Sequence, residues 1–224
     1  MNLIIEEIMG VNATNYYILH HLNIYWINMI NDIKLYIKKC LTCIKIKNNK
    51  KNTKIISKTI LSKGPKDRYV IDLWYYPPEL NSSNSNYAYI LDIIEHFSKY
   101  TETYLLNTKE SMEIFPYFKN FIKIHGIPKY VVTDIGKEFK NKLFKNFCDN
   151  NDFEFIHGLP YWPHSQGVAE RDHNIIKKGL LCHKIDLKNK YNINFSLDDV
   201  INIKNDTICR VTKKLLMIYF LMRI

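Results

Sequence analysis

The chain has 224 residues, of which 46% are hydrophobic, and its formal net charge is +10. This length suffices for one core domain of about 150 residues and a small appendage. The charge fits a polyanionic partner, although a merely basic soluble protein would also show it. The first residues lack a signal-peptide pattern, the late apolar run 215–222 is too short to span a bilayer, and the five cysteines are an odd number. We therefore expect an intracellular protein without disulfides or membrane contact.

The N-terminal third contains two regions before the main domain begins. Residues 1–44 are predicted to form a small helical unit that ends in Cys40 and Cys43, which have the two-residue gap of a zinc half-site. Residues 45–68 form a basic connector with nine lysines and arginines against one acid, Asp67. Either a solvated linker or a contact with DNA phosphates would explain this charge.

The first half of the main domain, which begins at residue 69, is predicted to contain three strands and a helix. The strands are rich in tyrosine, isoleucine and leucine, and cover 69–75, 87–94 and 100–106. Asn107, followed three residues later by Glu110, is typical of a helix start, and Gly126 ends that helix. Its apolar residues recur at helical spacing: Met112, Phe115, Phe118, Phe121 and Ile122. Pro116 should kink this helix or move its start.

The second half alternates between strands and helices. We expect strands at 129–133 and 153–157, a helix at 137–149, and a long helix from about 165 to 184. In the helix 137–149, residues Leu143, Phe144 and Phe147 should face inward. Three strands followed by alternating helix and strand predict an α/β fold with a mixed sheet flanked by helices.

Three acidic residues stand out by their surroundings. Asp72 lies within an apolar strand, Asp134 ends another, and Glu170 lies near the start of the long helix, with 35 residues between the last two. A carboxylate in a buried strand is unfavourable unless it is paired or binds a metal ion. Three acids that converge at one sheet edge would suit divalent cations and phosphodiester chemistry. Taken singly, each is more simply explained as a turn residue or a favourable charge near a helix N-terminus.

Three segments around these acids resemble the catalytic core of retroviral and retrotransposon integrases. The sequence TDIGKEF at 133–139 resembles the integrase segment TDNG-x-EF. The sequence PYWPHSQGVAER at 160–171 resembles PYHPQSQGxVER, and LDIIEHFSKY at 91–100 resembles VIDHFSKY. The order and spacing match, and the resemblance extends from about residue 40 to 212. The chain thus resembles a retrotransposon-type integrase of the kind found in gypsy-like elements, or in transposases and host genes derived from them.

The resemblance implies a ribonuclease H-like five-stranded sheet over residues 69–212, followed by a truncated tail at 213–224. It implies that Asp72, Asp134 and Glu170 are catalytic and hold two Mg²⁺ or Mn²⁺ ions, with Asp72 shared by both. The implied activity is the joining of DNA 3′ ends to target DNA by strand transfer. The implied partner is double-stranded DNA, and the implied assembly is a homodimer or higher oligomer. The implied location is the nucleus.

Departures from the family segments keep other functions open. Ile135 replaces the usual asparagine after the second aspartate, and Trp162 replaces a histidine before Glu170. One alternative is a non-catalytic DNA-binding relic or a host protein derived from an integrase. Another is a ribonuclease H-like nuclease without joining activity, which the proline-rich segment before Glu170 disfavours.

The helix that follows Glu170 carries the predicted DNA contacts. Glu170, His173, Asn174 and Lys177 share one helical face, and Lys178 lies at its margin. Ser165 and Gln166, from the preceding segment, complete the predicted DNA-binding set. Ala169, Ile176 and Leu180 fall on another face and should pack on the sheet. An ordinary amphipathic helix with a polar outer side would show the same pattern.

The N-terminal zinc unit is predicted to be incomplete. The family's small N-terminal domain uses two histidines and two cysteines, but the expected histidine pair near residues 5–10 is absent. His20 and His21 are adjacent, so their side chains should point about 100° apart on a helix. We therefore expect Cys40 and Cys43 to form at most a partial zinc site. Residues 1–44 should then be marginally ordered, or depend on the packing of a set of apolar residues: Leu22, Ile24, Trp26, Ile30 and Ile33.

Overall fold

The computed structural model describes residues 2–39, 62–78, 87–134, 136–158, 163–182 and 196–206. These residues form two compact units. The first contains the described residues up to Lys39 and those from His173 onward, and the second contains the described residues from Ser62 to Asp172. None of the helices in these ranges is long and apolar enough to cross a membrane.

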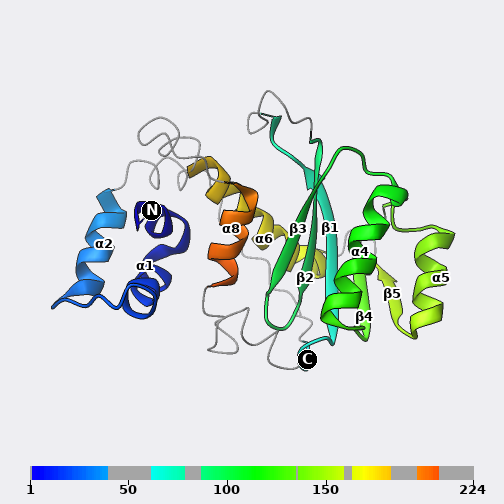
Figure 1. The fold of residues 1–224 in the computed structure, drawn as a ribbon, viewed down its shortest axis with the longest axis horizontal. Helices are drawn as coiled ribbons and strands as arrows, with labels where there is room; N and C mark the ends of the chain where they lie inside the picture. Colours follow the sequence, from blue (N-terminus) through cyan, green and yellow to red (C-terminus); the bar gives the residue numbers. More distant parts are fainter. Residues whose placement is uncertain are drawn as a thin grey trace. The chain divides into compact units, whose positions relative to one another are not determined.

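The second unit is built on a mixed five-stranded sheet (Figure 1). In chain order the strands are β1 (Arg68–Tyr75), β2 (Tyr89–Glu95), β3 (Thr101–Leu106), β4 (Tyr130–Thr133) and β5 (Glu154–His157). They are arranged in the order β3-β2-β1-β4-β5. The pairs β1/β2 and β2/β3 are antiparallel, whereas β1/β4 and β4/β5 are parallel. The sequence prediction of a mixed sheet flanked by helices is confirmed.

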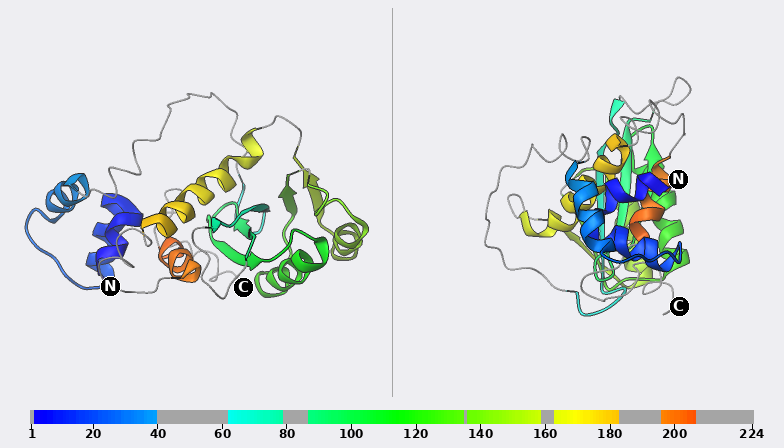
Figure 2. Two further views of the ribbon diagram at one scale, coloured as in Figure 1. Left: turned by 90° about the horizontal axis from the view of Figure 1, so that it is seen from above. Right: turned by 90° about the vertical axis from the view of Figure 1, so that its left-hand side faces the viewer.

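Helices α4 (Ser111–His125) and α5 (Lys142–Asn151) cover one face of this sheet (Figure 2). Fully buried aromatic rings fill the space between them and the strands, among them Phe118, Phe121 and Phe144. The Asn141 side chain caps α5 by accepting hydrogen bonds from the backbone N–H groups of Leu143 and Phe144. Burial of these rings is the main stabilising contribution to this half of the core.

The opposite face of the sheet is covered by the beginning of α6 (Pro163–Cys182). Ala169 is buried there against Val70 of β1, Ile94 of β2 and Val132 of β4. The small side chain of alanine lets the helix backbone approach the sheet closely. The first turns of α6 therefore bring the segment around Glu170 onto the sheet. The helix begins at Pro163, close to the predicted start at 165.

The helix α4 differs from its predicted course at the N-terminal end. It begins at Ser111 rather than at Asn107, because the Glu113 carboxylate accepts hydrogen bonds from the N–H groups of Asn107 and Thr108 at 2.8 Å each. Met112, predicted to face the core, is 74% exposed, and Ile114 is buried in its place. Pro116 lies within the helix, and the helix starts closer to it than the pattern at Asn107 and Glu110 predicted.

The first unit contains helices α1 (Asn2–His20), α2 (Met29–Lys39) and α8 (Leu197–Asn205). Gly10, with φ of 71°, interrupts α1, and α8, which was not predicted, begins with a capping box between Ser196 and Asp199. The apolar cluster between α1 and α2 consists of Ile18, Met29, Ile33 and Ile37, with Val11, Leu19 and Leu22 against it. The prediction that Ile24, Trp26 and Ile30 pack there was wrong, because these three side chains are exposed.

Candidate active site

Asp72 and Asp134 lie side by side at one end of the parallel strand pair β1/β4. Val70 of β1 is paired with Val132 of β4, and two further residues in the same direction lead to the two aspartates. Since side chains alternate along a strand, all four project from the same face. A small, partly open cavity on this face is lined by both aspartates and by Ala169 of α6. Residues 62 positions apart in sequence are thus brought to one place by strand pairing.

Each of these two carboxylates is oriented by a backbone N–H group. One oxygen of Asp72 accepts a hydrogen bond from the N–H of Leu73 at 2.8 Å, and Oδ1 of Asp134 accepts one from Gly136 at 3.2 Å. At Gly136 a Cβ atom would collide with the Glu138 carboxylate, so glycine lets this acid lie close to the turn after Asp134. Glu138 is a further carboxylate near the site that the sequence did not single out.

Glu170 is held near the sheet by its helical neighbours. Ala169 is buried on the sheet, and Asp172 is buried with its Oδ2 accepting a hydrogen bond from Thr101 of β3 at 2.8 Å. Glu170 lies between these two anchors, and its own side chain is exposed. It does not line the cavity of Asp72 and Asp134. Asp172 is an anchoring residue that sequence reasoning missed, because nothing in the sequence links it to Thr101.

The oxygen donors of Asp72 and Asp134 are of the kind that Mg²⁺ prefers. Two carboxylates at one cavity therefore fit a hard divalent cation, with its remaining positions filled by water. Within the described ranges, no three side chains of His, Cys, Asp or Glu are grouped closely enough to hold a metal ion. The pair Asp72 and Asp134 is thus assembled, whereas the participation of Glu170 stays a prediction.

Comparison with known proteins identifies the relatives of this segment. Residues 62–163 match the family model described as "Integrase core domain". The Gag-Pro-Pol polyprotein of Mason-Pfizer monkey virus is 26% identical over 171 residues, and the Retrovirus-related Pol polyprotein from transposon 412 of Drosophila melanogaster is 28% identical over 155 residues. These alignments cover 74% and 69% of the chain but only 9% and 12% of the two polyproteins. The chain therefore spans about a tenth of the length of these curated relatives.

The sheet-bearing part of the chain is similar to an integrase core, and we call it the integrase-like core.

Solved structures share the fold of the integrase-like core. The HTLV-2 integrase catalytic core domain in complex with magnesium has a TM-score of 0.52 at 22% identity, with coverage of 71% of this chain and 99% of that one. A chain of the simian T-cell lymphotropic virus intasome in complex with the PP2A regulatory subunit B56 gamma has a TM-score of 0.61 at 18% identity, with coverage of 93% and 74%. The fold class is therefore that of integrase catalytic cores, ribonuclease H-like.

The predicted DNA contacts lie on α6. Asn174 and Lys177 are exposed, and His173 and Lys178 are half-buried. Ile176 and Leu180 of the same helix are buried, as predicted for its apolar side. For Ser165 and Gln166 only the helical backbone is described, and their side chains lie outside the described part of the structure. The role of all six in DNA binding stays a prediction: Ser165, Gln166, His173, Asn174, Lys177 and Lys178.

The predicted zinc half-site belongs to the N-terminal part of the sequence. Cys40 and Cys43 lie outside the described residues. The ring of His20 packs against Tyr16 with centroids 4.2 Å apart, and that of His21 stacks on Tyr17 at 4.8 Å. The ring of His21 also meets Tyr16 edge-on, with centroids 6.3 Å apart, so both histidines pack on the tyrosines one helical turn earlier.

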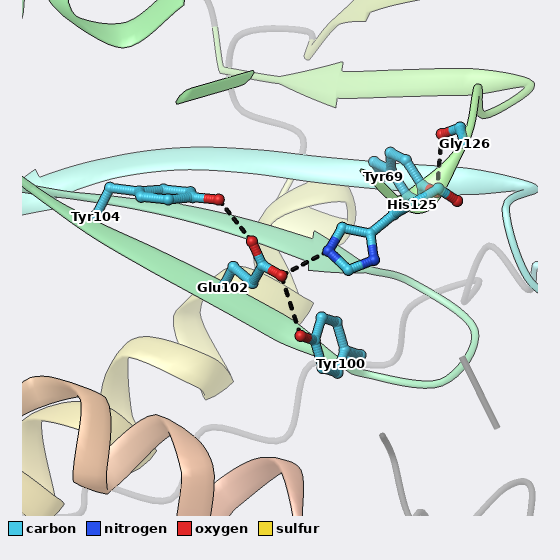
Figure 3. A network of polar contacts seen from close by, with 6 residues as sticks. All are labelled: Tyr69, Tyr100, Glu102, Tyr104, His125 and Gly126. Atoms are coloured by element: carbon cyan, nitrogen blue, oxygen red, sulfur yellow. Dashed lines mark hydrogen bonds and ion pairs between the residues drawn. The ribbon is translucent and has the colours of Figure 1, made fainter. Parts of the chain in front are cut away.

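A second polar cluster lies on the α4 face of the integrase-like core (Figure 3). Glu102 of β3 binds His125 Nε2 at 2.5 Å and accepts hydrogen bonds from the hydroxyls of Tyr100 and Tyr104. Burial alone would raise the pKa of Glu102, but the bonds from His125 and the two tyrosines outweigh it, and the pKa lies below its usual value. The cluster thereby joins β3 to the end of α4.

Proposed function

We propose that this protein is a DNA integrase or transposase of retroelement origin, which joins DNA 3′ ends to target DNA. The observation that carries the proposal is the pairing of Asp72 with Asp134 at one cavity beneath the start of α6. The similarity of residues 62–163 to the integrase core domain supports the same chemistry. The chemistry would use two Mg²⁺ or Mn²⁺ ions, and double-stranded DNA would be the substrate.

Asp72, Asp134 and Glu170 would hold the cations. When bound, such ions activate an attacking oxygen and stabilise the leaving oxygen of a phosphodiester. The chain supplies fixed oxygens for this purpose: the N–H of Leu73 orients Asp72, and the N–H of Gly136 orients Asp134. Because both carboxylates are fixed before substrate arrives, little reorganisation is needed at the moment of reaction.

The start of α6 would bring the third carboxylate to the pair. Ala169 and Asp172 fix the helix against the sheet on either side of Glu170. Glu170 is exposed between these two anchors, and its carboxylate would complete the set of oxygens around a cation held by Asp72 and Asp134. The polar residues further along α6 would contact DNA phosphates through their amide and ammonium groups.

Handling of two DNA ends requires more than one active site, so we propose that the protein works as a dimer or higher oligomer. Action on chromosomal DNA places this function in the nucleus. Both points are separate from the chemistry of the site and can be tested by light scattering of the purified chain and by localisation of the tagged protein.

The decisive experiment is a strand-transfer assay with short blunt DNA duplexes and a supercoiled acceptor, in the presence of Mg²⁺ or Mn²⁺. Asp72→Asn, Asp134→Asn and Glu170→Gln should each abolish joining and leave the circular dichroism spectrum unchanged. Glu154→Gln is the matched control, because Glu154 is an exposed acid of the same sheet.

The outcomes separate the alternatives. Joining by the wild-type chain, lost in all three acid variants but kept in the control, supports the proposal. A chain that cleaves without joining would be a nuclease of the same fold. DNA binding with neither cleavage nor joining would instead indicate a non-catalytic DNA-binding protein, and near wild-type turnover in any acid variant would overturn the assignment of that residue.

A further inference from the structure

Asp92 of β2 lies directly opposite Asp72 in the antiparallel pair β1/β2. Cβ atoms of directly opposite residues are about 5 Å apart, and both side chains project from the same face of the sheet. The neighbouring pairs agree with this direction, since Val70 and Ile94, which are also opposite one another, pack together with Ala169 on this face. Two carboxylates thus stand next to each other on the side of the sheet that carries the candidate active site.

Asp92 is fully buried, with an exposed fraction of 0%. Its Oδ2 accepts a hydrogen bond from the indole Nε1–H of Trp74 at 2.8 Å, and its neighbour on the other side, Thr103 of β3, is half-buried. The indole is a neutral donor that orients the carboxylate. A buried carboxylate beside a second one is unfavourable unless a cation balances the pair.

Asp92 does not line the cavity that Asp72 and Asp134 share. It lies on the neighbouring strand β2, so three acids form a row: Asp134 directly after β4, Asp72 on β1 and Asp92 on β2. In this row Asp72 is flanked by a carboxylate on each side. The negative charge behind Asp72 strengthens the attraction of its oxygens for a cation in the cavity.

We propose that Asp92 is a positioning residue of the cation site, whose buried carboxylate tightens divalent-cation binding at Asp72. The inference rests on the proposed function, because it assumes that a cation binds there. The indole of Trp74 fixes the direction of the Asp92 carboxylate but does not itself add charge to the cation site.

The test is equilibrium binding of Mn²⁺ to the full chain without DNA, followed by the electron paramagnetic resonance signal of free Mn²⁺. Asp92→Asn keeps the shape and an acceptor for Trp74 but removes the charge, and should weaken Mn²⁺ binding by about tenfold. Trp74→Phe removes the donor and keeps the charge, so it should leave the affinity within about threefold. If the buried amide of Asp92→Asn destabilises the chain, Asp92→Val is the second variant, because a valine side chain suits a buried strand.

Glu95→Gln is the matched control. Glu95 is on the same strand and equally buried, but it follows Ile93, which packs in the core on the α4 face, and its carboxylate binds the N–H groups of Phe97 and Ser98. Its replacement should leave Mn²⁺ affinity unchanged. A purely structural role for Asp92 would change thermal stability but not this affinity.

The outcomes distinguish this inference from the proposed function. A wild-type chain that binds Mn²⁺, with weaker binding in Asp72→Asn and in the Asp92 variants but not in Glu95→Gln, supports the inference. Equal affinity in wild type and Asp92 variants would overturn it and leave the proposed function intact. Absence of Mn²⁺ binding in the wild type, or binding unaffected by Asp72→Asn, would overturn both.

Discussion

His96 lies in the turn between β2 and β3, and its buried ring should make the folded chain less stable in mild acid. Its Nδ1 is 2.6 Å from the Ser62 hydroxyl, and only 8% of the residue is exposed. Burial, together with the positive charges of Lys99 and Arg68, lowers its pKa from 6.5 to about 4, against a smaller opposing effect of Asp67. The ring is therefore neutral in the fold at pH values where it is protonated in the unfolded chain.

The size and sign of the effect follow from proton linkage. Between pH 6.5 and about 4 the unfolded chain binds the additional proton, so the stability of the fold decreases as the pH falls through this window. One pKa unit corresponds to about 1.4 kcal/mol, and the lowered pKa therefore removes about 3 kcal/mol between neutral pH and pH 4. Above pH 6.5 the ring is neutral in both states, and this contribution no longer changes with pH.

Urea denaturation of wild type and His96→Asn at several pH values between 4 and 7.5 measures this contribution as a difference. The wild type should lose about 3 kcal/mol more than the variant over the window. Ser62→Ala is the matched control, because it removes the hydrogen bond, at a cost of about 1 kcal/mol at neutral pH, and keeps the ring. Identical pH slopes for wild type and His96→Asn would refute the reasoning.

Three further predictions concern the core, the charge and the zinc half-site. Phe118→Ala should cost about 3–5 kcal/mol in urea denaturation, because its fully buried ring packs on Phe144 and Phe153, whereas Met112→Ala on the same helix, at an exposed position, should change stability by less than about 0.5 kcal/mol; equal losses would contradict the core assignment. DNA affinity should fall steeply as the salt concentration rises. Replacement of connector lysines such as Lys63 and Lys66 together with Lys177 should flatten the dependence of the logarithm of the binding constant on the logarithm of the salt concentration. A salt-independent affinity would count against a phosphate contact. Freshly purified protein should hold less than one zinc ion per chain by mass spectrometry, since two cysteines fill half of a tetrahedral site; one tightly held zinc, lost when His20 or His21 is replaced, would show that these histidines complete it.

The order of the secondary structure could be predicted from the sequence because it depends on local patterns. Tyrosine- and isoleucine-rich runs bounded by turn residues gave the strands near their observed bounds, and Gly126 ended α4 where expected. Such patterns reflect the side-chain period of the element itself. The start of α4 was misplaced because the Glu113 side chain, within the helix, binds the backbone before it.

Local sequence patterns sufficed to predict the five strands, the helices other than α8 and the fold class, and family resemblance added three candidate acids. Which acids are neighbours depends on how the strands pair: the register of β1 with β4 brings Asp134 beside Asp72, and that of β1 with β2 brings Asp92 opposite it. The tertiary structure also decided that Asp172 anchors α6 through Thr101. The physical reason is that strand register is set by hydrogen bonds and packing between residues far apart in the chain, and no spacing within a single strand encodes them.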